Sequence, residues 1–275
     1  MMPASLSRFI RLLEDDIGVR LLNRSTRNVS LTAEGAIFLD EASDLIEQFD
    51  ALAKRFKGET KDNRRTFRIG AIDSAARGLV PALLNFFIQR HPATDIHIIE
   101  DKTIHLIPKL KSGWLDIIFF RAPQIIDASL SVQFITRESC VLAVPVSHPL
   151  SHKEEVSVED FQYDAMILPD RRTRPHSHDL TMSIFKQAGL TLHIAQYAEE
   201  KQTILSMVGA GLGIAVVPSS YKDMNNDNVT FIKLKLHENI KGLPLSIAWQ
   251  KGNEDRLVQE MLSLLSENEN ITQNL

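Results

Sequence analysis

The 275-residue sequence contains a single cysteine, Cys140, so it can form neither an internal disulfide nor a metal site built from several cysteines. No apolar run approaches the roughly 18 residues that a membrane-spanning helix requires. The first sixteen residues carry arginines and acidic residues without a long apolar stretch, which does not fit a secretory signal peptide. We therefore expect a cytoplasmic protein that has no membrane partner.

The chain also lacks a strong excess of charge of either sign. The net charge of −4 gives the chain no general attraction for nucleic acid, so any contact with DNA must be local. The apolar fraction of 44% is sufficient for a substantial core, and 24% charged residues is typical of a globular protein. The length fits one or two domains with a short additional segment.

The first 35 residues show a helical pattern followed by a hairpin pattern. Pro3 can begin a helix and Gly18 can end it in the left-handed conformation. The apolar residues that would share one face of this helix are Leu6, Ile10, Leu13 and Ile17. Two short apolar runs, VRLL and NVSL, then flank a polar turn that contains arginines. These features predict a helix and a two-stranded ribbon with a basic tip.

This segment resembles the recognition helix and wing of the LysR-type transcriptional regulators. The matching positions are Leu6, Ser7, Arg8, Ile10, Leu13, Glu14, Gly18, Leu21, Leu22, Arg24, Arg27, Leu31, Thr32 and Gly35. A helix-turn-helix needs an earlier helix, and only two methionines precede Pro3. The resemblance thus implies an incomplete winged helix-turn-helix over residues 1–32. The alternative is an ordinary amphipathic helix and hairpin, since five arginines against three acids is a weak basic bias.

The resemblance also implies which side chains would contact promoter DNA. On the helix, the candidates for the major groove or its phosphates are Ser5, Ser7, Arg8 and Arg11. On the wing, Arg24 and Arg27 would contact the backbone or the minor groove. The acids at the helix C-terminus oppose the helix dipole, whereas the arginines lie nearer the end that favours phosphate. Without the earlier helices, we expect DNA binding to be weakened.

Residues 33–60 have a coiled-coil pattern. Apolar residues recur at alternating spacings of four and three, at Phe38, Ala42, Leu45, Phe49, Leu52 and Phe56. In the LysR family this segment would be the linker helix that pairs subunits into a dimer or tetramer. A helix packed against its own domain is the alternative.

From residue 66 onward, strands alternate with helices, which predicts an α/β fold with parallel-type sheets covered on both faces. Two such series suggest two lobes with a cleft between them. The segments FRIGAIDSAARGLVPALLNFF, GWLDIIFFRAP, CVLAVPVSHPL and QTILSMVGAGLGIAVVPSS resemble the LysR effector-binding domain, which has the fold of type 2 periplasmic binding proteins. That likeness places an effector domain at 66–270, with lobe I at about 66–136 and 236–270 and lobe II at about 137–235.

Candidate ligand-binding residues lie where strands end and helices begin. Ligands of open α/β sheets bind beyond the carboxyl ends of the strands, and helix N-termini favour anions. Ser74 and Thr103 hold such positions and also resemble the family's effector-contacting hydroxyls. Arg121 follows the third strand and could pair with a carboxylate. The second lobe contributes Arg174, His176 and Ser177. Each residue alone could be an ordinary cap, but together they predict a site for a small anion such as an aromatic or aliphatic carboxylate.

Other chemistries are disfavoured. The run GAGLGIA (209–215) follows a helix and precedes a strand, the reverse of a dinucleotide loop, and we expect its glycines to end the helix. His176 and His178 lack further ligands for a metal. No catalytic set and no cofactor motif is present, so we do not expect an enzyme. The sequence predicts a LysR-type regulator whose effector alters lobe closure and the arrangement of its DNA-binding heads. The alternative is an effector-binding module that no longer binds DNA specifically.

Overall fold

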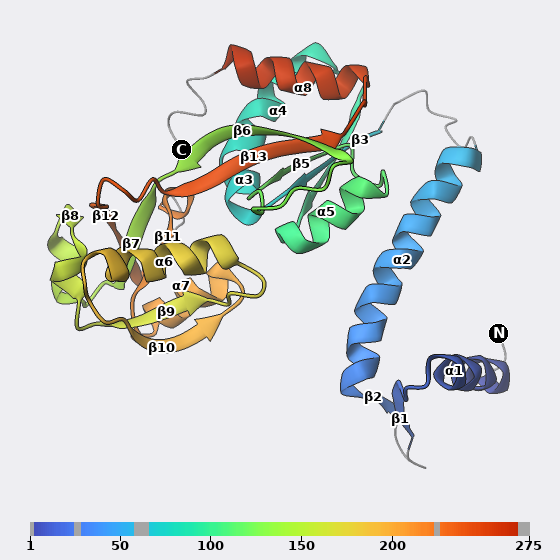
Figure 1. Ribbon diagram of the computed structural model, residues 1–275, viewed down its shortest axis with the longest axis horizontal. Coiled ribbons are helices and arrows are strands. Elements are labelled where there is room, and N and C mark those ends of the chain that lie inside the picture. Colours follow the sequence, from blue (N-terminus) through green and yellow to red (C-terminus); the bar gives the residue numbers. More distant parts are fainter. Residues whose placement is uncertain (1–2, 25–28, 58–65, 223–225, 269–275) are drawn as a thin grey trace. The chain divides into compact units, whose positions relative to one another are not determined.

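The computed structural model describes residues 3–24, 29–57, 66–222 and 226–268, and it divides into two units, 1–61 and 62–275 (Figure 1). Arg27 lies outside the described residues, as do the side chains of Ser5 and Arg24. None of the described helices is long and apolar enough to cross a membrane.

The first unit contains the predicted helix, ribbon and long helix. The elements are α1 (Pro3–Ile17), β1 (Leu22–Arg24), β2 (Val29–Leu31) and α2 (Ala33–Lys57), with β1 and β2 antiparallel. Gly18 ends α1 with a φ of +71°, as expected for a left-handed cap. Glu14, one of the acids near the end of α1, fixes the residues after the helix. Its Oε1 accepts hydrogen bonds from the backbone N–H groups of Leu21 and Leu22 at 2.8 and 2.9 Å.

The start of α2 is fixed against the two residues that precede the ribbon, Arg20 and Leu21. Thr32 is the N-cap: its hydroxyl accepts from the N–H of Gly35 at 2.8 Å and donates to the carbonyl of Arg20 at 2.7 Å. A Cβ atom on Gly35 would lie 2.0 Å from the carbonyl oxygen of Leu21, so this close approach requires glycine.

Apolar residues of α2 are exposed. Leu45 and Phe49, both part of the predicted seam, are 65% and 67% exposed, and the neighbouring Ile46 is exposed as well. The side chains of Leu52 and Phe56 are outside the described residues. Leu45 and Phe49 are thus not covered within the first unit.

The second unit has two lobes. Lobe I is a five-stranded sheet with the spatial order β4 (Asp95–Glu100), β3 (Thr66–Ala71), β5 (Ile117–Phe120), β13 (Leu243–Gln250) and β6 (Leu130–Glu138). β3, β4 and β5 are parallel, as predicted, whereas β13 is antiparallel to both β5 and β6. Its helices are α3 (Asp73–Arg77), α4 (Leu79–Arg90), α5 (Thr103–Lys111) and α8 (Arg256–Glu267). Figure 1 shows α4 and α8 on one face of the sheet and α5 on the other.

Lobe II contains a four-stranded sheet and a parallel pair. The four strands are, in order, β11 (Ala215–Pro218), β7 (Cys140–Pro145), β12 (Val229–Leu234) and β8 (Glu155–Val156), and the pair is β10 (His193–Ala198) with β9 (Ala165–Pro169). Backbone hydrogen bonds of Ile214 with Ile167 and Ala165 join the two sheets. The lobe has two α-helices in its described part, α6 (Pro175–Gln187) and α7 (Lys201–Gly209).

The position of β7 inside the four-stranded sheet explains why its sequence is apolar throughout. Leu142 and Val144 are buried in one cluster with Phe185 of α6, while Val141 and Ala143 are buried in another cluster that includes residues of α7. Helices therefore cover both faces, and the alternation expected of a half-exposed strand is absent.

The chain passes between the lobes twice. Ser139 alone separates β6, in lobe I, from β7, in lobe II, so the apolar stretch 131–145 forms two strands of different sheets. The return passage joins β12 to β13. Any change in the angle between the lobes must take place at these two passages.

Candidate functional site

A cavity of about 830 Å³ lies between the two lobes. Isoleucines 72, 104, 107 and 125 with Leu180 and Leu243 supply much of its apolar wall. Six cationic side chains line it, namely Lys102, Arg121, Arg137, Arg171, Arg174 and Lys201, against two carboxylates, Asp73 and Asp179. The wall thus has an excess of positive charge and suits an anion with an apolar part.

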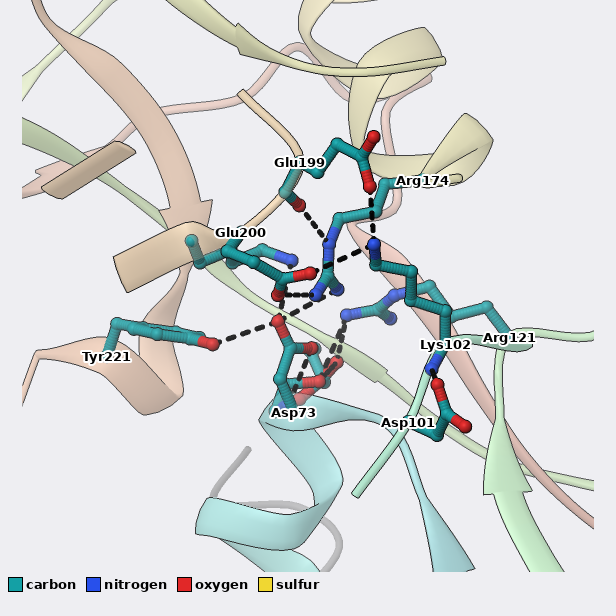
Figure 2. Close-up of polar contacts among 11 residues, drawn as sticks. Asp73, Asp101, Lys102, Arg121, Arg174, Glu199, Glu200 and Tyr221 are labelled. Atoms are coloured by element: carbon teal, nitrogen blue, oxygen red, sulfur yellow. Dashed lines mark hydrogen bonds and ion pairs between the residues drawn. The ribbon is translucent and has the colours of Figure 1, made fainter. Parts of the chain in front are cut away.

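Asp73 is the centre of a buried polar cluster in the wall of the cavity. It begins α3 in lobe I, and its Oδ2 contacts three donors of lobe II: Arg174 Nη1 at 2.9 Å, Lys201 Nζ at 3.2 Å and the Tyr221 hydroxyl at 2.9 Å. Figure 2 shows Arg174 and Tyr221 directed at this carboxylate. The other oxygen, Oδ1, accepts from the backbone N–H of Ser74 at 2.8 Å.

The charges of this cluster depend on one another. Burial by itself would raise the pKa of Asp73, but Lys201, Arg174 and the Tyr221 hydroxyl overcome that effect and hold the pKa well below its ordinary value. Burial lowers the pKa of Lys201 to about 8, although Asp73 acts in the opposite direction. Asp73 and Lys201 are only 5% and 2% exposed, so water cannot replace either partner.

A second set of ion pairs joins the lobes beside Asp73. Lys102, the residue before α5, contacts Glu199 at 2.6 Å and Glu200 at 3.0 Å (Figure 2). Arg174 also donates to Glu200 Oε2 at 2.8 Å and to the carbonyl of Glu199 at 2.6 Å. These contacts fix the positions of Lys102 and Arg174, two of the cations that line the cavity.

Arg121 and Glu138 form a third, buried group. Arg121 follows β5, and its Nη2 donates to Glu138 Oε2 at 2.5 Å and to the Ser74 hydroxyl at 3.2 Å. Ser74 Oγ in turn donates to the same Glu138 oxygen at 2.9 Å, and Arg121 Nη1 donates to the carbonyl of Pro244 at 2.9 Å. Glu138 Oε1 is buried without a hydrogen-bond partner in the part of the chain that the structure describes.

The cavity brings together most of the residues that the sequence singled out for a ligand. Thr103, Arg121, Arg174, His176 and Ser177 all line it. Burial lowers the pKa of His176, and the neighbouring Arg121 lowers it further, so the neutral imidazole is favoured. Ser74 is fully buried, and its hydroxyl is engaged by Arg121 and Glu138.

Sequence reasoning missed Asp73, Lys102, Lys201, Glu138 and Tyr221. The first three follow the ends of strands, so the rule that selected Thr103 and Arg121 could have found them as well. Glu138 is the last residue of β6, and Tyr221 lies in the short 3₁₀ turn after β11. Neither stands out in the sequence, because their roles depend on contacts between distant segments.

The predicted DNA-contacting residues Ser7, Arg8 and Arg11 are exposed on α1. The remaining candidates fall on parts that are not described: Arg27 itself, and the side chains of Ser5 and Arg24.

Thiol and metal chemistry find no support in the described residues. Cys140 is buried, and this burial raises its pKa to about 12, so the reactive thiolate is disfavoured. No group of three or more His, Cys, Asp or Glu residues is placed to hold a metal ion within the described ranges.

Comparison with known families yields two matches. Residues 60–269 match the LysR substrate binding domain, and residues 1–36 match the bacterial regulatory helix-turn-helix protein of the lysR family. Over 270 residues, the chain is 44% identical to the HTH-type transcriptional regulator TtuA of Agrobacterium vitis, covering 98% of this chain and 89% of that protein. It is 31% identical over 231 residues to the HTH-type transcriptional regulator BenM of Acinetobacter baylyi, covering 83% and 75%.

Solved structures agree with these matches. The BenM effector binding domain with its effector benzoate is similar with a TM-score of 0.64 and 27% identity, over 74% of this chain and 91% of that one. CbnR, at 21% identity and a TM-score of 0.74, covers 97% of this chain and 89% of its own and supports the fold. These relatives are transcriptional regulators rather than enzymes. One family model matches most of this chain, and a relative is 44% identical over nearly all of this chain. The chain therefore belongs to the LysR family of transcriptional regulators.

Proposed function

We propose that this LysR-family regulator acts in the cytoplasm, binds promoter DNA through its first unit and binds a small carboxylate between its two lobes. The observation that carries the proposal is the 830 Å³ cavity, whose wall combines isoleucines with six cations and two carboxylates. An anion with an apolar body would satisfy both parts of such a wall. BenM, whose effector domain was solved with benzoate, is a relative that binds a ligand of this kind.

The proposal assigns a role to each segment. Residues 1–32 form the recognition helix and wing, and residues 33–60 form a helix that pairs subunits into a dimer or tetramer. Residues 66–270 form the effector domain, with lobe I at about 66–136 and 236–270 and lobe II at about 137–235. The exposed Leu45 and Phe49 of α2 support pairing between chains, because large apolar side chains seldom stay uncovered in an assembled protein.

Within the cleft, Arg121 and Arg174 would hold the carboxylate by charge, and Thr103 and Ser177 would offer hydroxyl groups at the N-termini of α5 and α6. Neutral His176 would supply one donor and one acceptor. Ser74 acts on the ligand through Arg121, which its hydroxyl contacts.

For DNA, Ser7, Arg8 and Arg11 of α1 are the candidates that the structure shows exposed, while Ser5, Arg24 and Arg27 are proposed from the family resemblance. Residues 1–36 match the family's helix-turn-helix model. A module that no longer binds DNA specifically is therefore not favoured.

Calorimetry with a panel of carboxylates, beginning with benzoate, tests the ligand class. Thr103→Val keeps the volume but removes the hydroxyl, and it should weaken the best ligand about tenfold or more, as expected for a hydrogen bond to a charged group worth about 1.5–3 kcal/mol. Thr191→Val is the matched control, because Thr191 is exposed and outside the cavity wall. If no carboxylate binds, the proposed ligand class is wrong.

Binding to a fragment of the promoter that the regulator controls tests the DNA-binding role. Arg8→Ala with Arg11→Ala should weaken binding and lower the slope of log K against log salt by about 2, since each lost phosphate contact changes it by about 0.9. An unchanged slope would remove both arginines from the interface.

A further inference from the structure

Arg174 and Lys201, two cations of the proposed effector site, are already paired with an anion, the carboxylate of Asp73. Asp73 reaches from lobe I to Arg174, Lys201 and Tyr221, all from lobe II, and Asp73, Arg174 and Lys201 line the cavity. A carboxylate oxygen that contacts a guanidinium, an ammonium and a hydroxyl has the surroundings that a bound ligand carboxylate would have. The side chain of Asp73 thus occupies an anion position of the cleft.

We propose that Asp73 is a built-in competitor of the effector: a ligand carboxylate binds to Arg174 and Lys201 by displacing the carboxylate of Asp73. This inference rests on the carboxylate effector proposed above and adds the residue that determines which ligands can bind. A neutral ligand would leave the two cations without a counter-ion, because both are largely buried and water cannot take the place of Asp73. Only an anion can therefore make the exchange without a large electrostatic cost.

Space for the displaced side chain is present. A smaller hollow, of about 180 Å³, also has Asp73, Lys102 and Arg174 in its wall. The Asp73 side chain therefore borders two spaces. The smaller one is also lined by His105 and by the acids Glu100, Asp101 and Glu200. The low pKa of Asp73 is in keeping with its role as an anion at every physiological pH.

The exchange has a consequence for the lobes. In the structure, one side chain of lobe I links three groups of lobe II, whereas after the exchange the ligand would hold Arg174 and Lys201 instead. Ion pairs of Lys102 with Glu199 and Glu200 join the lobes independently of Asp73. Ligand binding would thus remove one connection between the lobes and retain another, which would alter their angle rather than separate them.

Chemical rescue tests the anion position without any knowledge of the effector. In the full 275-residue chain, Asp73→Ala removes the carboxylate, and acetate should then raise the melting temperature more than chloride at equal ionic strength. The parent should show a smaller difference between the two salts, as should Glu154→Ala, which removes an exposed carboxylate outside both hollows. Equal effects of acetate and chloride on Asp73→Ala would overturn the assignment of an anion position.

Calorimetry with benzoate and other carboxylates tests the competition. Asp73→Asn keeps the shape but frees the cations, so the best carboxylate should bind at least tenfold more tightly than to the parent. Glu154→Gln, the matched control at an exposed position outside both hollows, should bind like the parent. Unchanged, weaker or undetectable binding by Asp73→Asn would overturn the inference.

Tyr221→Phe is the second variant in case Asp73→Asn fails to fold. It removes one donor to Asp73 and lies outside the cavity wall, so a weaker internal competitor should give a severalfold gain in affinity. A merely structural tyrosine would produce no gain. Binding by the parent and Glu154→Gln decides the proposed ligand class, whereas the comparison with Asp73→Asn and Tyr221→Phe decides the inference.

Discussion

Arg121→Met should destabilise lobe I strongly, because it leaves a buried carboxylate without its cation. Glu138 is 1% exposed and Arg121 is 6% exposed, so solvent cannot compensate for the loss. The substitution also removes the donor to the carbonyl of Pro244, on the neighbouring strand β13. Removal of one partner from a buried pair typically costs about 3–5 kcal/mol.

The double variant Arg121→Met with Glu138→Gln separates this effect from general loss of packing. Once both charges are gone, the remaining cost is the unpaired Pro244 carbonyl, about 1–3 kcal/mol. The double variant should therefore be more stable than Arg121→Met, with a coupling free energy of at least about 2 kcal/mol between the two sites.

Urea unfolding followed by tryptophan fluorescence is a suitable assay. Both tryptophans, Trp114 and Trp249, pack against the core of lobe I, so their signal reports on this lobe. If the losses from the two single variants simply add in the double variant, to within about 0.5 kcal/mol, the two charges do not depend on each other and the reasoning is refuted.

Further predictions rest on the packing and the charges. Gly70→Ala should lower the free energy of unfolding by about 1–3 kcal/mol, because the added Cβ would lie 2.6 and 2.8 Å from two buried leucine side chains; a urea titration with an unchanged midpoint would contradict this. Carboxylate affinity should fall as the pH rises through about 8, where Lys201 loses its proton, and titration at constant ionic strength measures this. Between pH 8 and 10.5 the same group should add to stability with rising pH, since the unfolded chain retains the proton longer. Leu45→Asp with Phe49→Asp should yield smaller oligomers by light scattering while the circular dichroism of the effector domain stays intact; an unchanged mass would remove α2 from the interface.

Most of the fold could be predicted because its patterns are local. The helix over Pro3–Ile17, the cap at Gly18 and the alternation of strands and helices all follow from spacing and from glycine or proline positions. The antiparallel placement of β13 between β5 and β6 could not be read in this way. Pairing of strands more than a hundred residues apart depends on the whole topology, and no local pattern encodes it.

The candidate site was predictable only in part for the same reason. Strand ends identified Thr103, Arg121 and Arg174 individually, because each lies at the boundary of a local element. The partners that fix their charges, Asp73 and Glu138, meet them only when the two lobes and the strands of lobe I are assembled. Sequence alone therefore indicated the cations of the cleft but not the internal anions that neutralise them.

The position of β13 has a consequence for how the chain is made. Lobe II is encoded by one continuous stretch, whereas the sheet of lobe I lacks a central strand until residues 243–250 have left the ribosome. Because domains fold from the N-terminus as they emerge, lobe II can be complete while β5 and β6 still have unpaired edges. The cleft needs both lobes, so it is among the last features to form, and a nascent chain acquires ligand binding only near the end of its synthesis.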